Sequence, residues 1–299
     1  MIRIVLLGRT GNNLFQYALG RVLSEKHGVP LVLDGSWFNA AGWAEVSHFL
    51  DLPLKARVVR RCSPGTRILR KITGKHYWEY RGVPVLREAG DDQSFDRRFL
   101  DAPADCLLMG YYQSPLYFAE IAEPLRAELN ALITAAVRVT DDLRNPLRAA
   151  NTVAVHVRRK DYLHQPVFQV CDIRYYQESM RRMRASIPDA RFYVFSDDPD
   201  WCRSEFREAD QVVIDSGEAG ANPLHDLHLM SLTSHHIIAN SSYSWWSAWL
   251  GDKPGQQVMM PARWYAHGIK APIAEKRLDG WARDTMNHQT GLDVASDNG

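Results

Sequence analysis

Apolar residues along the chain fall into short runs that alternate with segments of helical periodicity. Residues 2–7 form the first run, turn-forming residues follow from Gly8 to Asn13, and apolar positions then recur at helical spacing as far as His27. A second apolar run at 31–34 completes a strand–helix–strand unit. Such a unit is the building block of a parallel sheet, so we expect the chain to begin with an α/β domain.

The middle of the chain has a weaker pattern. Between Ser36 and Leu108 the sequence is rich in Arg, Gly and Pro, and its apolar spacing is irregular. The pattern there predicts only a strand at 106–109, with a helix after it from Pro115 to about Val137.

A second alternating series begins after Pro146. It opens with a run typical of a buried strand at 152–157. We expect further strands at 191–196, 211–215, 236–240 and 257–261, and helices at 175–187, 199–207, 225–233 and 241–251. This alternation predicts a doubly wound parallel sheet, which binds ligands at the carboxyl ends of its strands. We therefore predict an α/β protein of two Rossmann-like domains, residues 1–148 and 149–299, that face a cleft.

Composition narrows the range of partners. The 299 residues are 45% hydrophobic and 24% charged, and 36 Lys and Arg against 35 Asp and Glu give a formal net charge of +1. These values are typical of a soluble globular protein and provide no overall field for nucleic acid, so we expect no nucleic-acid partner.

The cellular location follows from what the chain does not contain. The four cysteines are scattered without a CxxC pair, which indicates a reducing compartment. No segment approaches the roughly 20 apolar residues of a membrane span, and no signal peptide precedes the first strand, so we expect a cytoplasmic protein. A basic stretch from Arg57 to Lys71 has two interpretations, a solvated face or a seat for anionic lipid headgroups that would place the protein peripherally on the inner membrane.

The loop between the first strand and the first helix is a candidate ligand loop. Gly8, Arg9, Gly11 and Asn12 lie in it, and glycines allow a close approach to a ligand while Arg9 favours an anion. It matches neither a dinucleotide fingerprint nor an ATP-binding loop, and a plain turn is an equal alternative.

A basic cluster ends the predicted strand at 152–157. His156, Arg158 and Lys160 fall on one side of it if the backbone stays extended. A guanidinium at the carboxyl edge of a parallel sheet can hold a diphosphate through two hydrogen bonds, which points to Arg158. The alternative is a solvated basic loop, and His156 alone is more typical of a buried core histidine.

Hydroxyl and amide side chains open the predicted helix at 241–251. They belong to Asn240, Ser241, Ser242, Tyr243 and Ser244. The first amides of a helix lack intrahelical partners and carry the positive end of its dipole, so this helix start is a candidate phosphate seat. The same residues are also good helix caps, and the two interpretations are compatible.

Two carboxylates follow the predicted strand at 191–196. Asp197 or Asp198 can accept two hydrogen bonds from the amide and amine edge of guanine. Asp198 and Asp200 are instead candidates for Mg²⁺ or Mn²⁺, and aspartate before Pro199 is also a routine helix cap.

Four segments, in this order, resemble the family 11 glycosyltransferases, the α-1,2-fucosyltransferases. The segments are GRTGNNLFQYALGRVLS, GYYQSPLYF, HVRRKDY and DLHLMSLTSHHIIANSSYSWWSAWLG. The resemblance runs from residue 4 to about 265. It implies a GT-B-like fold, GDP-β-L-fucose as donor, transfer with inversion to the 2-hydroxyl of a galactose-containing acceptor, and no metal or other cofactor. A bacterial surface polysaccharide such as the O-antigen of lipopolysaccharide is the expected product.

The resemblance also implies roles for individual residues. Arg158 and Asn12 would be catalytic, with Arg158 on the β-phosphate and Asn12 facing the fucose. The implied donor-binding residues are His156, Arg158, Asp197, Asp198, Asp226, Asn240, Ser241, Ser242, Tyr243 and Ser244. Asp226 would contact the nucleotide or cap its helix. Arg9, Asn12 and Gln113 would lie on the acceptor side.

Several points stay open at this stage. The family usually has Gly-Leu at Arg9-Thr10, Gln at Asn13 and Gly at Lys160, so the acceptor side is less well defined than the donor side. His76 and Glu79 are equal candidates for a general base, and a mechanism without a base is a further alternative. A metal-dependent transferase, a fucosyltransferase of another linkage and an inactive GDP-sugar-binding protein are the rival hypotheses.

Overall fold

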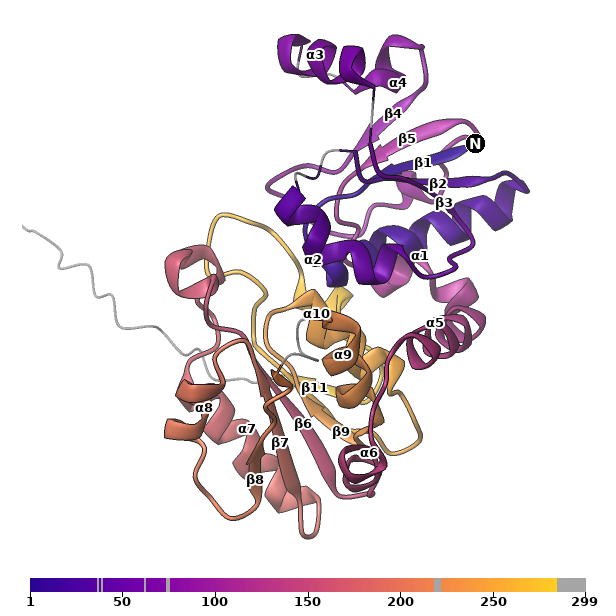
Figure 1. The fold of residues 1–299 in the computed structure, drawn as a ribbon. Helices are drawn as coiled ribbons and strands as arrows, with labels where there is room; N and C mark the ends of the chain where they lie inside the picture. The colour runs from indigo at the N-terminus through magenta and orange to yellow at the C-terminus, as the bar shows by residue number, and fades with distance from the viewer. Residues whose placement is uncertain (37, 39, 62, 74–75, 218–221, 284–299) are drawn as a thin grey trace, which may run out of the picture.

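Two parallel sheets form the framework of the protein in the computed structural model (Figure 1). The structure describes residues 1–283 apart from 37, 39, 62, 74, 75 and 218–221. The first sheet has the strand order β3-β2-β1-β5-β4. Its strands are β1 (Ile2–Val5), β2 (Leu31–Asp34), β3 (Arg57–Val59), β4 (Val85–Arg87) and β5 (Cys106–Met109).

Helices of the first domain connect these strands. They are α1 (Thr10–His27), α2 (Ala40–Leu50), α3 (Pro64–Thr73) and α4 (Tyr77–Tyr80). The predicted strand–helix–strand unit is confirmed, and Gly28 ends α1 with a φ of 62° that favours glycine. The strands β3 and β4 were not predicted, because both lie in the stretch of irregular apolar spacing between Ser36 and Leu108.

The connection between the two sheets is helical. The predicted helix from Pro115 is wrong in its first turns, because two short 3₁₀ turns (Pro115–Tyr117 and Ala119–Ile121) precede α5 (Ala122–Ala136). A further helix, α6 (Asp141–Leu147), contains Pro146, where the sequence pattern indicated only a boundary. The predicted division at residue 149 falls between α6 and the first strand of the second sheet.

The second sheet has the order β11-β10-β9-β6-β7-β8. Its strands are β6 (Thr152–Val157), β7 (Arg191–Ser196), β8 (Gln211–Val213), β9 (His235–Ile237), β10 (Val258–Met260) and β11 (Trp281–Arg283). The helices are α7 (Ile173–Ser186), α8 (Pro199–Glu205), α9 (Pro223–Leu232) and α10 (Ser242–Leu250). The strand pairings described in both sheets are parallel, so the predicted fold class is confirmed. The strand at 257–261 is not the last, because β11 pairs with β10 after a long excursion.

Each sheet has a point where the strand order reverses. In the first sheet the reversal lies between β1 and β5, and in the second it lies between β6 and β9. Ligands of open α/β sheets bind beyond the carboxyl ends of the strands at such a point. The segments that follow these four strands are the ones in which the sequence places Asn12, Gln113, Arg158 and Ser242.

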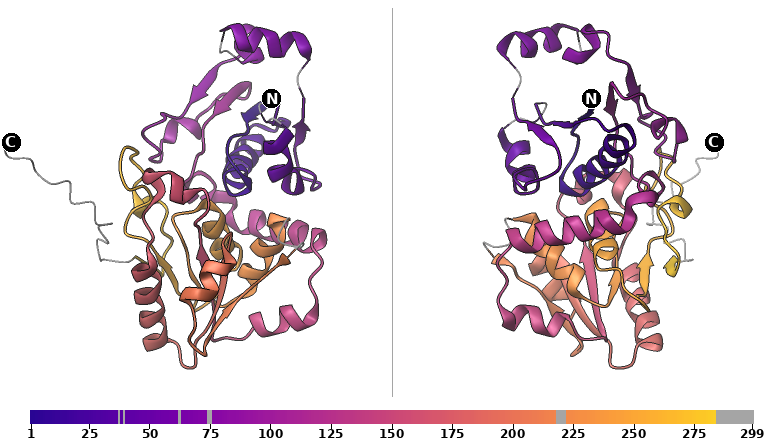
Figure 2. Two further views of the ribbon diagram at one scale, coloured as in Figure 1. Left: turned by 60° about the vertical axis from the view of Figure 1, so that its left-hand side comes forward. Right: turned by 90° about the vertical axis from the view of Figure 1, so that its right-hand side faces the viewer.

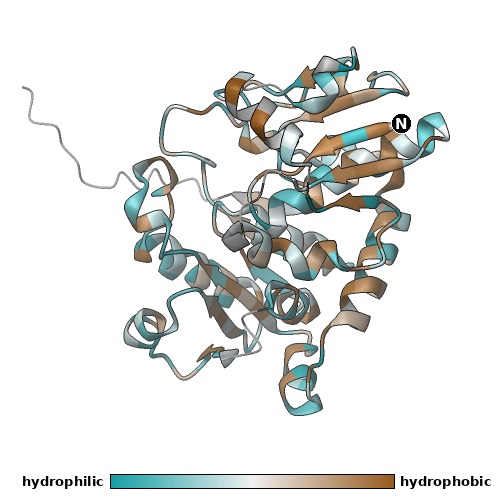
Figure 3. Ribbon diagram, turned by 45° about the horizontal axis from the view of Figure 1, so that its top comes forward, coloured by the Kyte–Doolittle hydropathy of each residue, from teal (hydrophilic) through white to brown (hydrophobic). Residues whose placement is uncertain are grey.

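An aromatic core joins the two domains where α1 meets α10. The ring of Phe15 lies 4.8 Å from that of Trp245 and 5.0 Å from that of Trp246, and Phe118 stacks on Trp246. Trp245, Trp246 and Trp249 are buried. In Figure 3 the strands of the first sheet are coloured mostly as apolar, whereas the loops around them are more polar.

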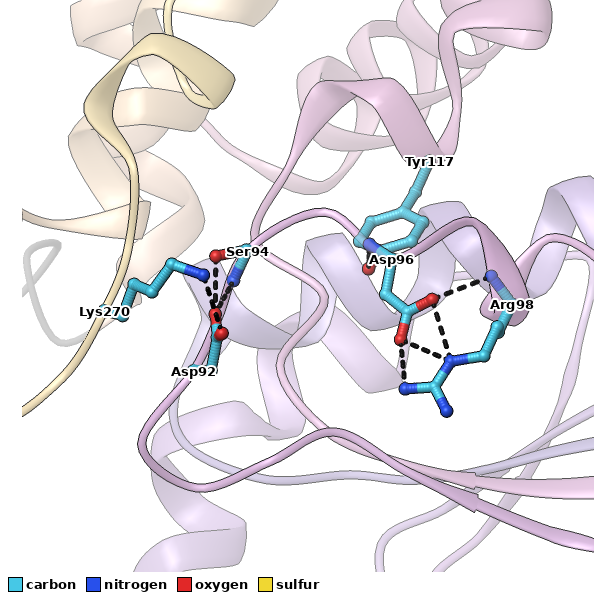
Figure 4. Close-up of polar contacts among 6 residues, drawn as sticks. All are labelled: Asp92, Ser94, Asp96, Arg98, Tyr117 and Lys270. Carbon is cyan, nitrogen blue, oxygen red and sulfur yellow. Dashed lines mark hydrogen bonds and ion pairs between the residues drawn. The ribbon is translucent and has the colours of Figure 1, made fainter.

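The chain returns to the first domain after β10. The amide of Gln93 donates to the carbonyl of Lys270 at 2.7 Å, and Lys270 Nζ lies 2.9 Å from Asp92 Oδ2 (Figure 4). Ser94 also donates to Asp92, so this carboxylate anchors the returning segment. We call residues 261–280 the strap, because they pass from the second sheet to the first domain and back.

Two further sequence predictions concern cysteines and membrane spans. Cys106, Cys171 and Cys202 are free thiols, and Cys62 lies outside the described residues. In the described part of the chain, no helix is both long enough and apolar enough to cross a bilayer.

Candidate functional site

An alternating chain of charges lies where the two domains meet. Arg158 Nε is 2.8 Å from Asp161 Oδ1, and Arg158 Nη1 is 3.2 Å from Asp197 Oδ2. Asp161 Oδ2 lies 3.4 Å from Arg9 Nη1 of the first domain. Asp161 therefore connects the basic residues of both domains. The sequence had named it only as part of the motif.

Arg158 stays charged in this setting. Its side chain is only 20% exposed, and burial alone would lower its pKa, but hydrogen bonding to Asp161 and the charge of Asp197 leave the pKa raised. Burial likewise works to raise the pKa of Asp161, while Arg158 holds it below its ordinary value. The guanidinium is thus kept in place by anions before any substrate binds.

His156 is a neutral neighbour of this charge chain. It is 5% exposed, and burial together with the charge of Arg158 lowers its pKa to about 3. Among the described residues its Nδ1 has no hydrogen-bond partner, and its ring lies 5.5 Å from the ring of Tyr243. The imidazole is therefore uncharged at neutral pH and has one ring nitrogen to offer.

Arg159 points to a different set of partners. Its Nε is 3.0 Å from Asp198 Oδ2, and its guanidinium lies 3.7 Å from the ring centroid of Trp201. Asp198 also accepts from the amide of Trp201 as the N-cap of α8, which bears out the capping interpretation. Asp197 accepts from the amide of Arg159 with its other oxygen.

The acidic residues Asp198 and Asp200 were also candidates for a metal site. Asp200 pairs with Arg203 at 2.7 Å and is almost fully exposed. In the described parts of the chain, no three His, Cys, Asp or Glu side chains gather in a way that could hold a metal ion.

Three of the residues predicted to bind the donor substrate make hydrogen bonds that stabilise the start of α10. Asn240 Nδ2 donates to the carbonyls of Phe168 and Trp264, Ser244 Oγ donates to Ser241, and the hydroxyl of Tyr243 donates to Pro223. These bonds fix the turn that opens the helix.

Ser241 and Ser242 are the other two residues of this helix start. Ser241 is the N-cap of α10, although its side chain makes no capping bond, and Ser242 Oγ donates to Asn12 Oδ1 at 2.8 Å. Gly11 lies against them so closely that a Cβ atom there would be 2.5 Å from the amide nitrogen of Tyr243. The first turn of α1 therefore covers part of the first turn of α10.

Asn12 and Gln113 link the first domain to this helix start. Gln113 Nε2 donates to Asn12 Oδ1 at 2.8 Å, so the same oxygen accepts from both domains. The side-chain nitrogen Nδ2 of Asn12 lies over Gly8, where an added Cβ would collide with it. Gly8 is also left-handed, with a φ of 71°.

The strap supplies two partners of Gln113 that sequence reasoning missed. Trp264 Nε1 donates to Gln113 Oε1 at 3.0 Å, and Lys276 Nζ donates to the Gln113 carbonyl at 2.6 Å. Lys276 is 2% exposed, and its burial lowers its pKa to about 7 although Glu88 opposes the shift. A lysine near the end of a chain carries no sequence signal for such a place.

Glu88 is the third residue that sequence reasoning missed. Its carboxylate accepts from the amides of Tyr111 at 2.7 Å and Tyr112 at 3.1 Å, just before Gln113. Tyr112 has a φ of 55°, which is uncommon for a residue with a side chain, so Glu88 holds a strained turn. Burial raises the pKa of Glu88 despite these bonds.

Asp226 lies in the first turn of α9. The N-cap of that helix is Asn222, which accepts from the amide of Leu224, so the capping alternative for Asp226 is wrong. Its Oδ1 instead accepts from Ser216 and lies 3.0 Å from His225 Nδ1.

The two candidates for a general base both serve α4. His76 accepts from the amide of Trp78 while Glu79 accepts from the amide of His76, which forms a capping box. His76 Nε2 also lies 3.2 Å from Asp34 Oδ2, and Glu79 pairs with Arg87. Both side chains therefore stabilise the local structure around α4 and make no described contact with Arg158 or Asp161.

Two parallel α/β domains whose strand ends meet at such a polar rim define the GT-B type of glycosyltransferase. The model of glycosyl transferase family 11 matches residues 91–283, and the chain belongs to that family.

Curated relatives extend along most of the chain. An α-1,2-colitosyltransferase of Escherichia coli is 28% identical over 87% of this chain and 91% of its own length. The O-antigen biosynthesis glycosyltransferase WbnK of Escherichia coli is 33% identical over 92% and 98%. Galactoside α-(1,2)-fucosyltransferase 1 of Sus scrofa is 28% identical over 81% and 63%. Among solved structures, the fucosyltransferase NodZ from Bradyrhizobium aligns with a TM-score of 0.46 at 17% identity, over 82% of this chain and 92% of that one.

Proposed function

We propose that the protein transfers L-fucose from GDP-β-L-fucose to the 2-hydroxyl of a galactoside, with inversion, in the synthesis of a bacterial surface polysaccharide such as O-antigen. The observation that carries the proposal is the placement of Arg158, a mostly buried cation at the carboxyl end of β6 and beside the charge of the first domain. Membership of family 11 and relatives named for α-1,2 transfer and O-antigen synthesis support the linkage and the pathway.

In this proposal, the departure of GDP is the difficult part of the reaction. The acceptor hydroxyl attacks the anomeric carbon from the face opposite GDP while the bond from that carbon to the diphosphate oxygen breaks. Negative charge grows on the β-phosphate, and the hydroxyl proton passes to solvent in a mechanism without a protein base. Arg158 would take this charge, since Asp161 and Asp197 already hold it charged and oriented. Loss of one such preorganised donor typically costs about 3 kcal/mol, or roughly 100- to 1000-fold in rate.

The other donor contacts follow from which side chains are already used. Ser241 is the hydroxyl best placed for the diphosphate, because its side chain makes no capping bond. Ser244, Tyr243 and Asn240 brace the turn, and Ser242 donates to Asn12. Asp197 and Asp198 are equal candidates for guanine, because an arginine engages each of them. His156 would lie beside the nucleotide as a neutral imidazole.

Asn12 acts in this proposal mainly by positioning. Its oxygen accepts from Ser242 and Gln113, so it fixes the diphosphate seat relative to the acceptor side. Arg9 and Gln113 belong to that acceptor side. Arg9 also pairs with Asp161, which places its charge near the proposed donor site. Because Arg158, Arg9 and the positive end of α10 already supply positive charge, we propose that no metal is needed.

The test is the release of GDP from GDP-fucose, measured with and without a panel of β-galactosides and with and without EDTA. We expect acceptor-dependent release that survives EDTA, and a product whose nuclear magnetic resonance spectrum shows an α-1,2 linkage. Loss of release in EDTA would favour a metal site at Asp198 and Asp200, and tight binding without release would favour a GDP-sugar-binding protein. Another linkage in the product would refute the regiochemistry alone.

A GDP-linked colitose is a second candidate donor. The name of the colitosyltransferase relative, which matches 87% of this chain, favours it. Comparing kcat/KM for the two donors on one acceptor separates the candidates. A value at least ten-fold higher for GDP-fucose is the expected outcome, and the reverse order would reassign the donor.

A further inference from the structure

The charges of the protein are unevenly distributed along the chain. Residues 52–78, which we call the basic segment, contain no Asp or Glu. They contain eight Lys and Arg, namely Lys55, Arg57, Arg60, Arg61, Arg67, Arg70, Lys71 and Lys75. With eight of the 36 Lys and Arg there, 28 are left to face 35 Asp and Glu in the rest of the chain. A nearly neutral protein therefore has one strongly basic part.

Apolar side chains are exposed in the same segment. Ile68 is 59% exposed and Ile72 is 76% exposed, and both lie on α3. They are four residues apart, which places them on the same face of the helix one turn from each other. Neither Ile68 nor Ile72 belongs to a hydrophobic core of the protein. Two large apolar side chains on α3 are thus left exposed to water.

The position of α3 leaves this face accessible. Figures 1 and 2 show α3 at the end of the first domain, on the side away from the second domain, in every view. Its main contacts in the described part of the chain are with α4, the short helix that follows it. In Figure 1 the second sheet, with β6 and β9, lies on the opposite side of the first domain from α3. An extended surface could approach α3 without blocking the site.

Two exposed basic residues near α3 lack a carboxylate partner among the side chains that the structure describes. Among the described residues, no carboxylate pairs with Arg57 or Arg61, and both side chains are exposed. Lys55 and Arg60 differ, because they pair with Glu128 and Asp51. Arg57 and Arg61 are therefore the described cations that an external anion would meet.

We propose that α3, together with the neighbouring Arg57 and Arg61, docks the protein on a membrane surface rich in anionic lipid. Apolar side chains that enter the headgroup boundary, combined with cations that meet anionic headgroups, are the chemistry of interfacial helices. Nucleic acid would use the cations but gain nothing from Ile68 and Ile72, so the exposed pair favours lipid. The inference goes beyond the proposed function and does not depend on it.

The test uses the full chain and sedimentation with vesicles of phosphatidylcholine, with or without 30% phosphatidylglycerol. We expect binding to the anionic vesicles only, and weaker binding as salt rises because surface charges are screened. Changing Arg57→Gln together with Arg61→Gln should weaken the binding about 25-fold, at about five-fold for each charge. Ile68→Ser with Ile72→Ser should weaken it about ten-fold or more.

Matched variants separate docking from general effects. Arg97→Gln with Arg207→Gln removes two exposed charges elsewhere, and Val212→Ser removes an exposed apolar side chain on β8. These should bind vesicles as the wild type does. All variants should keep their GDP release with a soluble acceptor, so a failure of the proposed function would be visible separately. Equal binding to neutral vesicles, binding unaffected by either pair of changes, or binding to duplex RNA but not to vesicles would overturn the proposal.

Discussion

His156 lies in β6 and Arg158 just beyond its end, yet burial affects their charges differently. Burial and a neighbouring cation keep His156 neutral, with a pKa of about 3. Arg158 is largely shielded from solvent too, but two carboxylates compensate its charge and it stays protonated. The proposed site therefore presents one fixed cation and one neutral imidazole over the whole physiological pH range.

The state of His156 gives a direct prediction. We expect its imidazole to remain neutral down to pH 5, because charging it would place a second cation beside Arg158 in a dry setting. The proton resonance that disappears in His156→Gln can be followed from pH 8 to pH 5. A transition with a midpoint between pH 6 and 7 would contradict the burial argument.

Lys276 gives a prediction about stability. Its pKa is about 7 in the folded protein, below the ordinary value of 10.5, so between these values the unfolded chain binds more protons than the folded one. The penalty for burying the charge is present below pH 7 and is relieved as pH rises through this window. The wild type should therefore gain stability relative to Lys276→Met between pH 7 and pH 10, as measured by Tm. A difference in Tm that does not change with pH would refute the shift.

Strands inside a clear apolar run could be predicted from the sequence, and strands in an irregular pattern could not. β6 and β7 are six residues each, and β8, β9 and β10, although only three residues long, lie in five-residue segments whose pattern identified them. β3 and β4 lie in the stretch of irregular apolar spacing, and β11 contains only Trp, Ala and Arg. Arg158 and Ser242 follow predicted strands, so the sequence could name them as candidates. Glu88 follows β4, an unpredicted strand, and was missed with it.

The contact between α1 and α10 gives a prediction about a pair of elements. Gly11→Ala would place a Cβ 2.5 Å from the amide of Tyr243, so one helix must shift and the Asn12–Ser242 hydrogen bond must change. We expect kcat/KM to fall about ten-fold or more and Tm to fall by several degrees. Gly90→Ala is the control, because nothing lies within 4 Å of the added Cβ there. Equal, wild-type behaviour of both variants would show that the close approach has no role.

The two domains and the strap meet at Gln113. Its side chain donates a hydrogen bond to Asn12, and Gln113 accepts hydrogen bonds from Trp264 and Lys276. The sequence indicated Gln113 only through a family resemblance, since its partners lie more than 100 residues away in both directions. Residues so far apart come together only through the whole fold, and no local pattern encodes the contact. This is why residue patterns alone gave no sign of the connection between the two domains at Gln113.

The loss of this junction should affect the whole molecule. Gln113→Met keeps the volume but leaves Asn12 Oδ1 with one donor and Trp264 Nε1 unpaired, at a cost of about 1–3 kcal/mol for the buried donor. We expect a lower Tm and a KM for the acceptor raised about ten-fold. Gln257→Met, which loses one exposed bond to Ser186, should leave the KM unchanged. An unaltered acceptor KM in Gln113→Met would separate the junction from acceptor binding.

The charge on Arg158 is the centre of the account, and its replacement tests it most directly. Turnover of GDP-fucose at saturating donor should be compared for the wild type, Arg158→Lys and Arg158→Ala, with Arg174→Lys as an exposed control that also pairs with an aspartate. We expect kcat to fall roughly 100- to 1000-fold in Arg158→Ala. It should fall less in Arg158→Lys, which keeps the charge without the two-pronged geometry, and stay unchanged in Arg174→Lys. Near-normal turnover in Arg158→Ala would contradict the assignment of the leaving diphosphate to this residue.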